Sequence, residues 1–308
     1  MSAAQILCLG EPLVEFNQTP EGQFAMGFGG DVSNVAISAS RHGANAGLIT
    51  RVGTDPFGAA LCGLWTDEGV STANVTEAQG EETGVYFVTH DTDGHHFTYR
   101  RTGSAASRLA PDDLPLDALQ SCPMFYASGI SLAVSDSMRA AVVAAAEATR
   151  TAGGVFAFDP NLRVALWPLE FAREVTHSVM AACDIALPGL DDARQLTGLQ
   201  PPEEIVRFYH DLGPRIVALT LGADGVLISV DGDMRTLPGH RVDAKDATGA
   251  GDCFNGAFLA SLLDTQDPFA AAEHANMAAA ISTTGYGAVA PIPTVSHTRS
   301  ALNAAWQS

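Results

Sequence analysis

The stretch Asp246-Ala247-Thr248-Gly249-Ala250-Gly251-Asp252 decides how this 308-residue chain is interpreted. An apolar run over residues 253–263 follows it, with the length and composition of a helix. Glycines on both sides of Ala250 allow a tight turn, so the amides of Ala250, Gly251 and Asp252 are expected to point outward from the positive end of that helix. The segment therefore predicts an anion-binding loop that needs no lysine.

Asp252 is expected in the first turn of this helix, where the helix dipole favours the carboxylate form and lets it accept a proton from an alcohol. Two other interpretations fit the same letters. One is an ordinary glycine turn before an acidic first-turn residue. The other is a dinucleotide-binding fingerprint, which is disfavoured because Phe254 stands where the third glycine belongs and because the segment lies late in the chain.

The charge of the chain limits its partners. Sixteen basic residues against 35 acidic ones give a formal net charge of −19, which argues against nucleic acid and anionic membranes as partners. Fifteen of the basic residues are arginines, and Lys245 is the single lysine. A lysine-containing phosphate loop is therefore excluded, and a phosphate must be held by backbone amides and arginines.

Cysteine usage and hydropathy indicate the compartment. The five cysteines are scattered and never occur as C-x-x-C, which argues against disulfides and a zinc site. The apolar stretch at residues 140–146 ends at Glu147, far short of a membrane span, and no basic segment precedes a long apolar run near Met1. A cytoplasmic protein is expected.

Short apolar runs alternate with helix-length segments through most of the chain. Buried strands are predicted at residues 46–52, 124–128, 155–158, 185–187 and 216–221, and helices at 135–151 and 169–182. This alternation is typical of an α/β fold with a mostly parallel sheet and helices on both faces, in which ligands bind at the carboxyl ends of the strands.

Two stretches, residues 13–28 and 83–101, instead show the pattern of β-hairpins. They predict a small second sheet that closes over the site as a lid. The whole chain, residues 1–308, is expected to be one structural unit, with lid segments at about 12–29 and 83–102.

The D-x-T-G-A-G-D segment resembles the signature of the ribokinase-like sugar kinases, the PfkB family. The resemblance implies an ATP- and Mg²⁺-dependent kinase. In that family the loop forms the anion hole for the transferring phosphoryl group, here Gly249, Ala250 and Gly251. The last aspartate of the segment, here Asp252, acts as base on the sugar hydroxyl.

The amino-terminal half carries the sugar-side motifs of the same family. Residues 29–36, Gly-Gly-Asp-Val-Ser-Asn-Val-Ala, resemble its glycine pair, which implies that Gly30 and Asn34 face the sugar. Residues 10–16, 99–107, 128–133 and 158–163 resemble the branch that phosphorylates 2-keto-3-deoxygluconate.

By the same resemblance Tyr86, Tyr99, Arg101 and Arg163 contact this substrate, and paired guanidinium groups suit its carboxylate. Without the resemblance, the tyrosines are equally explained as aromatics covering a sheet face. The two consecutive arginines Arg100 and Arg101 are then better explained as a solvated strand end.

On the nucleotide side, the resemblance implies roles for Thr220, Gly222, Gly225 and Asn276, with Gly249 and Gly251 of the loop. Thr220 stands where the family usually has lysine. The family's N-x-x-E segment, whose acid helps to position Mg²⁺, corresponds to residues 189–192, so the asparagine is replaced by glycine and the acid is the shorter Asp192. Asp192 is expected to act on the metal through water. An acidic helix start explains it equally well.

The expected reaction is transfer of the ATP γ-phosphoryl group to the 6-hydroxyl of 2-keto-3-deoxygluconate. A fructokinase or another ribokinase-like sugar kinase is the close alternative, and an inactive sugar-binding regulatory module is the alternative of a different class. The resemblance also allows a potassium ion near residues 246–252 and a homodimer formed through the lid.

Overall fold

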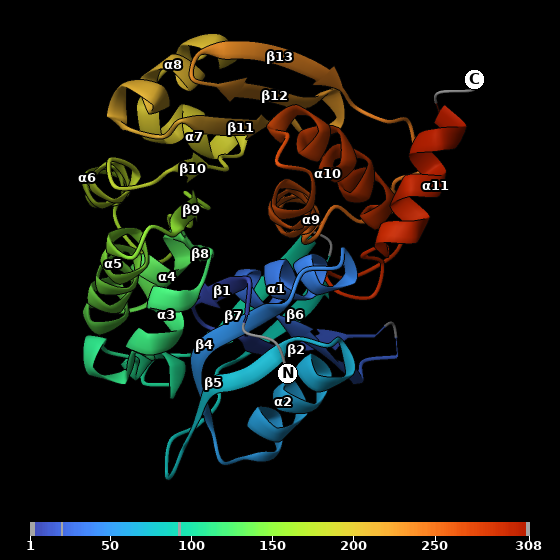
Figure 1. The fold of residues 1–308 in the computed structure, drawn as a ribbon. Helices are drawn as coiled ribbons and strands as arrows, with labels where there is room; N and C mark the ends of the chain where they lie inside the picture. Colours follow the sequence, from blue (N-terminus) through green and yellow to red (C-terminus); the bar gives the residue numbers. More distant parts are fainter. Residues whose placement is uncertain (1–3, 20, 92–93, 306–308) are drawn as a thin grey trace.

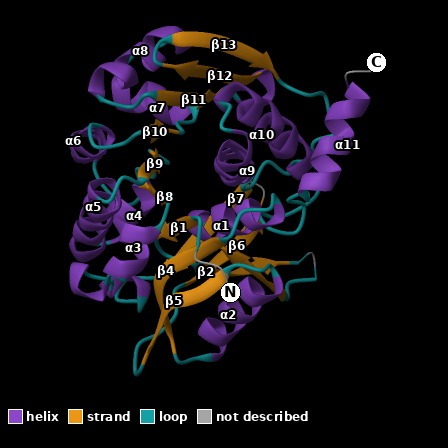
Figure 2. Cartoon of the chain, viewed as in Figure 1, coloured by secondary structure: helices purple, strands orange, loops and turns teal. Residues whose placement is uncertain are grey.

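The structure, a computed structural model, describes residues 4–19, 21–91 and 94–305. Its largest feature is a nine-stranded sheet with the strand order β13-β12-β11-β10-β9-β8-β1-β4-β5 (Figures 1 and 2). The strands are β1 (Ile6–Leu9), β4 (Ala46–Gly53), β5 (Ser71–Ala78), β8 (Met124–Ser128), β9 (Val155–Asp159), β10 (Ile185–Ala186), β11 (Ile216–Thr220), β12 (Gly225–Val230) and β13 (Asp233–Pro238). Neighbouring strands from β5 to β11 pair in parallel, and β12 and β13 continue the sheet antiparallel.

Helices cover both faces of this sheet, as predicted. One face carries α1 (Asp31–Arg41), α2 (Pro56–Asp67), α9 (Ala250–Thr265) and α10 (Pro268–Ser282). The other carries α3 (Leu116–Ser121), α4 (Gly129–Val134), α5 (Asp136–Thr151), α6 (Leu169–Met180), α7 (Leu190–Thr197) and α8 (Pro202–Leu212). Both faces of the central strands β1 and β8 are thereby buried, which explains their continuous apolar runs.

The remaining elements are short or peripheral. The last helix, α11 (Val295–Ala305), packs on α10. Single turns of 3₁₀ helix occur at Ala106–Arg108, Pro111–Asp113 and Gly222–Asp224. No helix among the described residues is long and apolar enough to cross a membrane. All five cysteines are free thiols, as the sequence predicts.

The two predicted hairpins form a separate four-stranded sheet in the order β3-β2-β6-β7. Its strands are β2 (Leu13–Gln18), β3 (Phe24–Gly29), β6 (Val85–Asp91) and β7 (Gly94–Arg100). The two hairpins join through a parallel pairing of β2 with β6. The Phe16 ring meets the Phe57 ring of α2 edge-on at 5.6 Å between centroids, which anchors one side of the small sheet to the main body.

The topology directs several loops to one place. The carboxyl ends of the parallel strands β9, β10 and β11 open toward the start of α9, on the edge where ligands of such sheets bind (Figure 1). Asp159 ends β9 and Thr220 ends β11, while Gly189 follows β10 and pairs with Thr220. The fold therefore brings side chains far apart in sequence to a single edge.

Candidate active site

The loop at residues 246–249 is held by its first aspartate. One carboxylate oxygen of Asp246 accepts hydrogen bonds from the Thr248 amide at 2.9 Å and the Thr248 hydroxyl at 2.6 Å. The other oxygen accepts from the Gly287 amide at 2.8 Å. Gly249 is left-handed (φ 74°), and a Cβ there would lie 2.8 Å from the Cβ of Ala288. Asp246 and Gly249 thus have structural reasons to be present.

Helix α9 begins directly after this loop and presents its amino-terminal amides. The Ala250 amide donates to the Ala247 carbonyl at 3.1 Å and closes the turn, so it does not point outward as the sequence predicts. The amides of Gly251 and Asp252 lie in the first helical turn, where no intrahelical acceptor exists. A Cβ on Gly251 would meet open space. These two amides make the helix start suitable for an anion.

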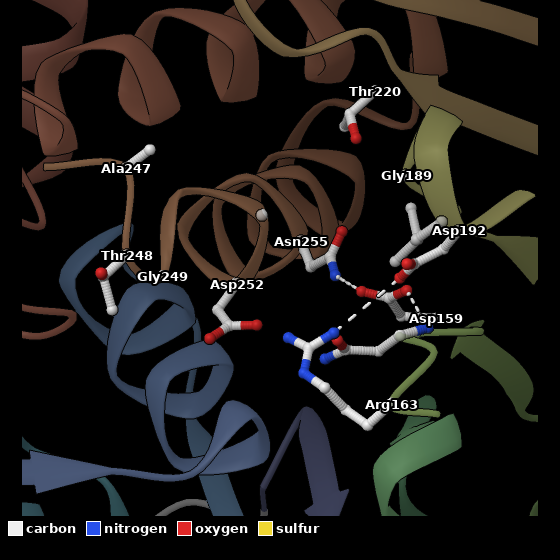
Figure 3. Close-up of a pocket in the computed structure, with 13 residues that line it drawn as sticks. Asp159, Arg163, Gly189, Asp192, Thr220, Ala247, Thr248, Gly249, Asp252 and Asn255 are labelled. Atoms are coloured by element: carbon white, nitrogen blue, oxygen red, sulfur yellow. Dashed lines mark hydrogen bonds and ion pairs between the residues drawn. The ribbon is translucent and has the colours of Figure 1, made fainter. Parts of the chain in front are cut away.

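A cavity of about 390 Å³ lies between the start of α9 and the strand ends (Figure 3). Its lining combines loop, strand-end and helix residues: Asp159, Asn161, Arg163, Leu187, Gly189, Asp192, Thr220, Ala247, Thr248, Gly249, Gly251, Asp252 and Asn255. The predicted residues Arg163, Asp192, Thr220, Gly249, Gly251 and Asp252 are therefore brought together. In Figure 3 the carboxylate of Asp252 and the guanidinium of Arg163 point toward one another across this space.

Asp252 is half-buried, and its Oδ2 accepts a hydrogen bond of 2.8 Å from Nδ2 of Asn34 on α1. Burial raises the pKa of Asp252 well above its ordinary value, and the charges of Asp31 and Asp159 raise it further, against the opposing effects of the Asn34 hydrogen bond and Arg163. The sequence predicts that the helix dipole keeps this carboxyl ionised, and burial beside two other acids acts against that effect.

Asp159 and Asn255 line the cavity although neither has a role in the sequence-based expectation. Asp159 accepts from the Asn161 amide at 2.9 Å and from Nδ2 of Asn255 at 2.7 Å. Burial raises the pKa of Asp159 to about 7. Asn255 lies one helical turn after Asp252, and this spacing could have identified it as a site residue from the sequence. Asp159 is the last residue of a buried strand, but the sequence around it is equally typical of an ordinary turn and so did not identify it as a site residue.

The two predicted arginines occupy different places. Arg163 lines the cavity with a half-exposed side chain, and its Nη1 lies 3.9 Å from Oδ2 of Asp192. Arg101 follows β7, lies outside the cavity lining, and forms an ion pair with the fully buried carboxylate of Glu11. The Oε1 of Glu11 also accepts from the Ser104 hydroxyl at 2.8 Å. The structure thus assembles one of the expected pair at the cavity.

Tyr86 and Tyr99 lie opposite one another on β6 and β7, with stacked rings 5.6 Å apart. The Tyr86 hydroxyl donates to the carboxylate of Glu15 on β2. Against this ring lies Gly29, where a Cβ would approach the Tyr86 hydroxyl to 2.6 Å. Gly30 follows with φ 100°, and a Cβ on it would lie 2.7 Å from the Glu11 carbonyl. The glycine pair therefore permits the close approach of the small sheet to the start of α1.

The predicted nucleotide-side residues are dispersed. Thr220 lines the cavity. Gly225 has φ 103°, and a Cβ there would lie 2.1 Å from the Leu237 carbonyl, so it shapes the β12–β13 hairpin; Gly222 is left-handed with open space around it. The buried Asn276 side chain donates to the Pro238 carbonyl at 2.8 Å. Nucleotide binding by Gly222, Gly225 and Asn276 stays a prediction.

Asp192 is the candidate for positioning a metal. Its Oδ2 accepts from the Leu162 amide at 2.9 Å, and burial raises its pKa. The described residues contain no group of three His, Cys, Asp or Glu that could hold a metal ion. The Asp192 carboxylate alone suits Mg²⁺ that is bound mainly by phosphate oxygens and water, and does not suit a cage built by the protein.

Comparison with known proteins shows which family this chain resembles. A family model described as pfkB family carbohydrate kinase matches residues 3–295. The 2-dehydro-3-deoxygluconokinase of Thermoproteus tenax is 35% identical over 293 residues, covering 90% of this chain and 87% of that protein. Probable fructokinase-4 of Arabidopsis thaliana is 34% identical over 315 residues, covering 96% of each. A double-mutant fructokinase of Vibrio cholerae O395, solved with fructose, ADP and potassium ion, has a TM-score of 0.87 and 27% identity, covering 97% of this chain and 99% of that one.

Proposed function

Because this chain belongs to the pfkB family of carbohydrate kinases, and so phosphorylates a sugar, we propose that it transfers the γ-phosphoryl group of ATP to the 6-hydroxyl of 2-keto-3-deoxygluconate. The observation that carries the proposal is one cavity into which Asp252, the first-turn amides of α9 and the guanidinium of Arg163 all open. Similarity to the kinase from Thermoproteus tenax supports the choice of sugar.

Asp252 is the proposed base. The substrate O–H bond breaks as the new O–P bond forms and the bond between the γ-phosphorus and the β,γ-bridging oxygen breaks, so the proton passes to the Asp252 carboxylate and ADP leaves. Asn34 holds this carboxylate through its 2.8 Å hydrogen bond. The amides of Gly251 and Asp252 are aimed where charge accumulates on the transferring group.

The site suits a Mg²⁺ ion that is bound mainly by phosphate oxygens and water, and Asp192 would contact this ion through a water molecule. When bound, such an ion neutralises negative charge on the phosphates. A potassium ion near residues 246–252 belongs to the same proposal, and the relative from Vibrio cholerae was solved with that ion. Thr220, Gly222, Gly225 and Asn276 are proposed for the nucleotide side.

The sugar acid is proposed to lie between the cavity and the small sheet. Arg163 is the single basic residue among the described residues of the cavity lining, and it faces three acids there, so an anionic sugar is held in place by it. Gly30, Tyr86, Tyr99 and Arg101 are proposed to complete the sugar side when the small sheet closes as a lid. Arg101 has five N–H donors in a planar fork, so it can keep its pairing with Glu11 and still bind a carboxylate.

A fructokinase is the second candidate, and one observation favours it specifically. Arg101 is already neutralised by Glu11, which leaves Arg163 as the cation available to an acid sugar. Similarity to the Arabidopsis fructokinase is also nearly as high as to the acid-sugar kinase.

The test is release of ADP from ATP and Mg²⁺ in the presence of 2-keto-3-deoxygluconate, 2-keto-3-deoxygalactonate, fructose or ribose, with Asp252→Asn as the matched control for contaminating kinase. The proposal expects the highest kcat/KM with 2-keto-3-deoxygluconate. A higher value with fructose selects the second candidate. Sugar binding without turnover for any member of the panel indicates a regulatory module and overturns the proposal.

A further inference from the structure

The connection between α10 and α11, residues 283–294, supports the loop that begins at Asp246. This connection contains no charged residue and forms neither helix nor strand. Its Gly287 amide donates to Oδ2 of Asp246 at 2.8 Å. Its Ala288 packs against Gly249 so closely that a Cβ on Gly249 would lie 2.8 Å from the Cβ of Ala288. The position of the loop before α9 therefore depends on how this connection is held.

Arg41, the last residue of α1, holds the connection a few residues further on. Its Nη1 donates to the Val289 carbonyl at 3.0 Å and to the Ile292 carbonyl at 2.6 Å. The Ala290 carbonyl lies 3.4 Å from the same nitrogen. Hydrogen bonds from a charged donor are stronger than those between neutral groups. One guanidinium thus fixes a stretch of backbone that has no charged side chain of its own.

The guanidinium of Arg41 is itself fixed by Glu68, which follows α2. Nε and Nη2 of Arg41 each donate to one carboxylate oxygen of Glu68 at 2.7 Å, which is a bidentate pairing. The Glu68 carbonyl accepts from the Ser40 hydroxyl at 2.7 Å, so Glu68 is held against the end of α1. The side chains of Arg41 and Glu68 are only 19% and 20% exposed. A pair with this geometry is more rigid than an ordinary surface ion pair and can hold a neighbouring segment in place.

We propose that Arg41 is a positioning residue for phosphoryl transfer, which acts through residues 287–292 on the loop before α9. The inference rests on the proposed function of the first-turn amides of α9, those of Gly251 and Asp252, in holding the transferring phosphoryl group. Such donors stabilise the developing charge only when they are already aimed at it. A small displacement caused by a change far from the reacting atoms is therefore costly in rate.

Helix α1 offers a second route from Arg41 to the site, and the two routes have different effects. Asn34 lies about 10 Å from Arg41 along the helix axis and donates to Asp252. Gly30 precedes the same helix, and both residues are expected to face the sugar. A disturbance that travels through α1 thus weakens sugar binding. A disturbance that travels through residues 287–292 lowers the rate and leaves the sugar side as it is.

The experiment measures kcat and the KM for the sugar at saturating ATP, with whichever sugar of the panel the wild type phosphorylates. Arg41→Met keeps the length of the side chain and removes its donors. Arg299→Met is the matched control, because it removes an arginine of α11 whose ion pair with Asp264 is exposed. The proposal expects kcat of Arg41→Met to fall by about 10- to 100-fold with the sugar KM unchanged. Both parameters of Arg299→Met are expected to equal those of the wild type.

Hydrogen–deuterium exchange locates the disturbance and needs no turnover. Three amides report on it: that of Thr248, which donates to Asp246, that of Gly287, and that of Ile292, which donates to the Val289 carbonyl. All three are expected to exchange faster in Arg41→Met than in the wild type, because local opening becomes easier. The same amides are expected to exchange at the wild-type rate in Arg299→Met.

Three results overturn the proposal: a kcat of Arg41→Met equal to that of the wild type, a fall in kcat that is accompanied by a higher sugar KM, or unchanged exchange at Thr248. If thermal unfolding shows that Arg41→Met does not fold, Arg41→Lys is measured instead. Its compact ammonium cannot replace the planar fork that joins Glu68 to two carbonyls, so the same results are required of it. A wild-type protein without turnover on any sugar is a failure of the proposed function, and the exchange measurement still tests the link from Arg41 to the loop.

Discussion

At the scale of single residues, the site is determined by what surrounds Asp252. The amide of Asn34 orients its carboxylate, while burial and, to a lesser extent, the charges of Asp31 and Asp159 raise its pKa. The sequence identifies Asp252 through its motif, but the neighbours come from α1 and β9, both more than ninety residues earlier in the chain. The local sequence therefore predicts the base and its position in the helix, whereas the protonation of Asp252 depends on burial that only the fold creates.

Replacing Asp252 with Asn is expected to lower kcat by about 10²- to 10⁴-fold, because the variant cannot accept the hydroxyl proton. ATP binding measured by calorimetry is expected to remain, since the amides of α9 are unchanged. Asp191→Asn is the matched control, because Asp191 is exposed beside the cavity and its loss leaves kcat as in the wild type. Near-normal turnover by Asp252→Asn contradicts the proposed mechanism.

At the scale of elements, the carboxyl-end edge of the sheet and the small sheet were predictable. The strand predicted at 124–128 matches β8, and both hairpins are confirmed. The strands β1, β5, β12 and β13 were not predicted. β5 and β13 are the two edge strands and are partly exposed, so they lack the continuous apolar run that marks a central strand. β1 and β12 are short, buried apolar runs that the same criterion could have found. The ion-pair partner of Arg101 was also not predicted. The sequence analysis expects Arg101 at the ligand, whereas the fold places the buried Glu11 beside it.

The ion pair at the base of the small sheet gives a stability prediction. Arg101→Ala is expected to lower the free energy of unfolding by about 3–5 kcal/mol, since it leaves the buried Glu11 carboxylate without its cation. Urea unfolding measures this. The double variant Arg101→Ala/Glu11→Gln is expected to recover much of the loss because the unpaired charge is gone. Equal stability of the single and double variants counts against a buried charge at Glu11.

At the scale of the whole molecule, the small sheet carries exposed apolar side chains on both faces. Phe24 and Met26 lie on the face of Phe16, and Phe97 and Tyr99 on the opposite face with Tyr86; all four are more than 40% exposed. Exposed strands of this composition are commonly covered by a partner. A homodimer formed through the lid remains a prediction, and the net charge of −19, which argues against nucleic acid and anionic membranes, does not oppose an apolar contact of this kind.

Sedimentation velocity tests the dimer. The wild-type protein is expected to sediment as a dimer and Phe97→Asp as a monomer, because a charge at this 56% exposed ring position prevents burial of the face that carries Phe97 and Tyr99. Val143→Asp, on the 49% exposed part of α5, is the matched control and is expected to remain dimeric. A monomeric wild-type protein at micromolar concentration rules out the lid dimer.

The central claim is that this sugar kinase acts on an acid sugar through Arg163. Its most direct test is the ratio of kcat/KM for 2-keto-3-deoxygluconate to that for 3-deoxyfructose, which differs only in carrying a hydroxymethyl group in place of the carboxylate. The predicted ratio for the wild type is about 10- to 150-fold, corresponding to roughly 1.5–3 kcal/mol for a charged hydrogen bond, and it decreases toward unity in Arg163→Ala. A wild-type ratio at or below unity contradicts the account.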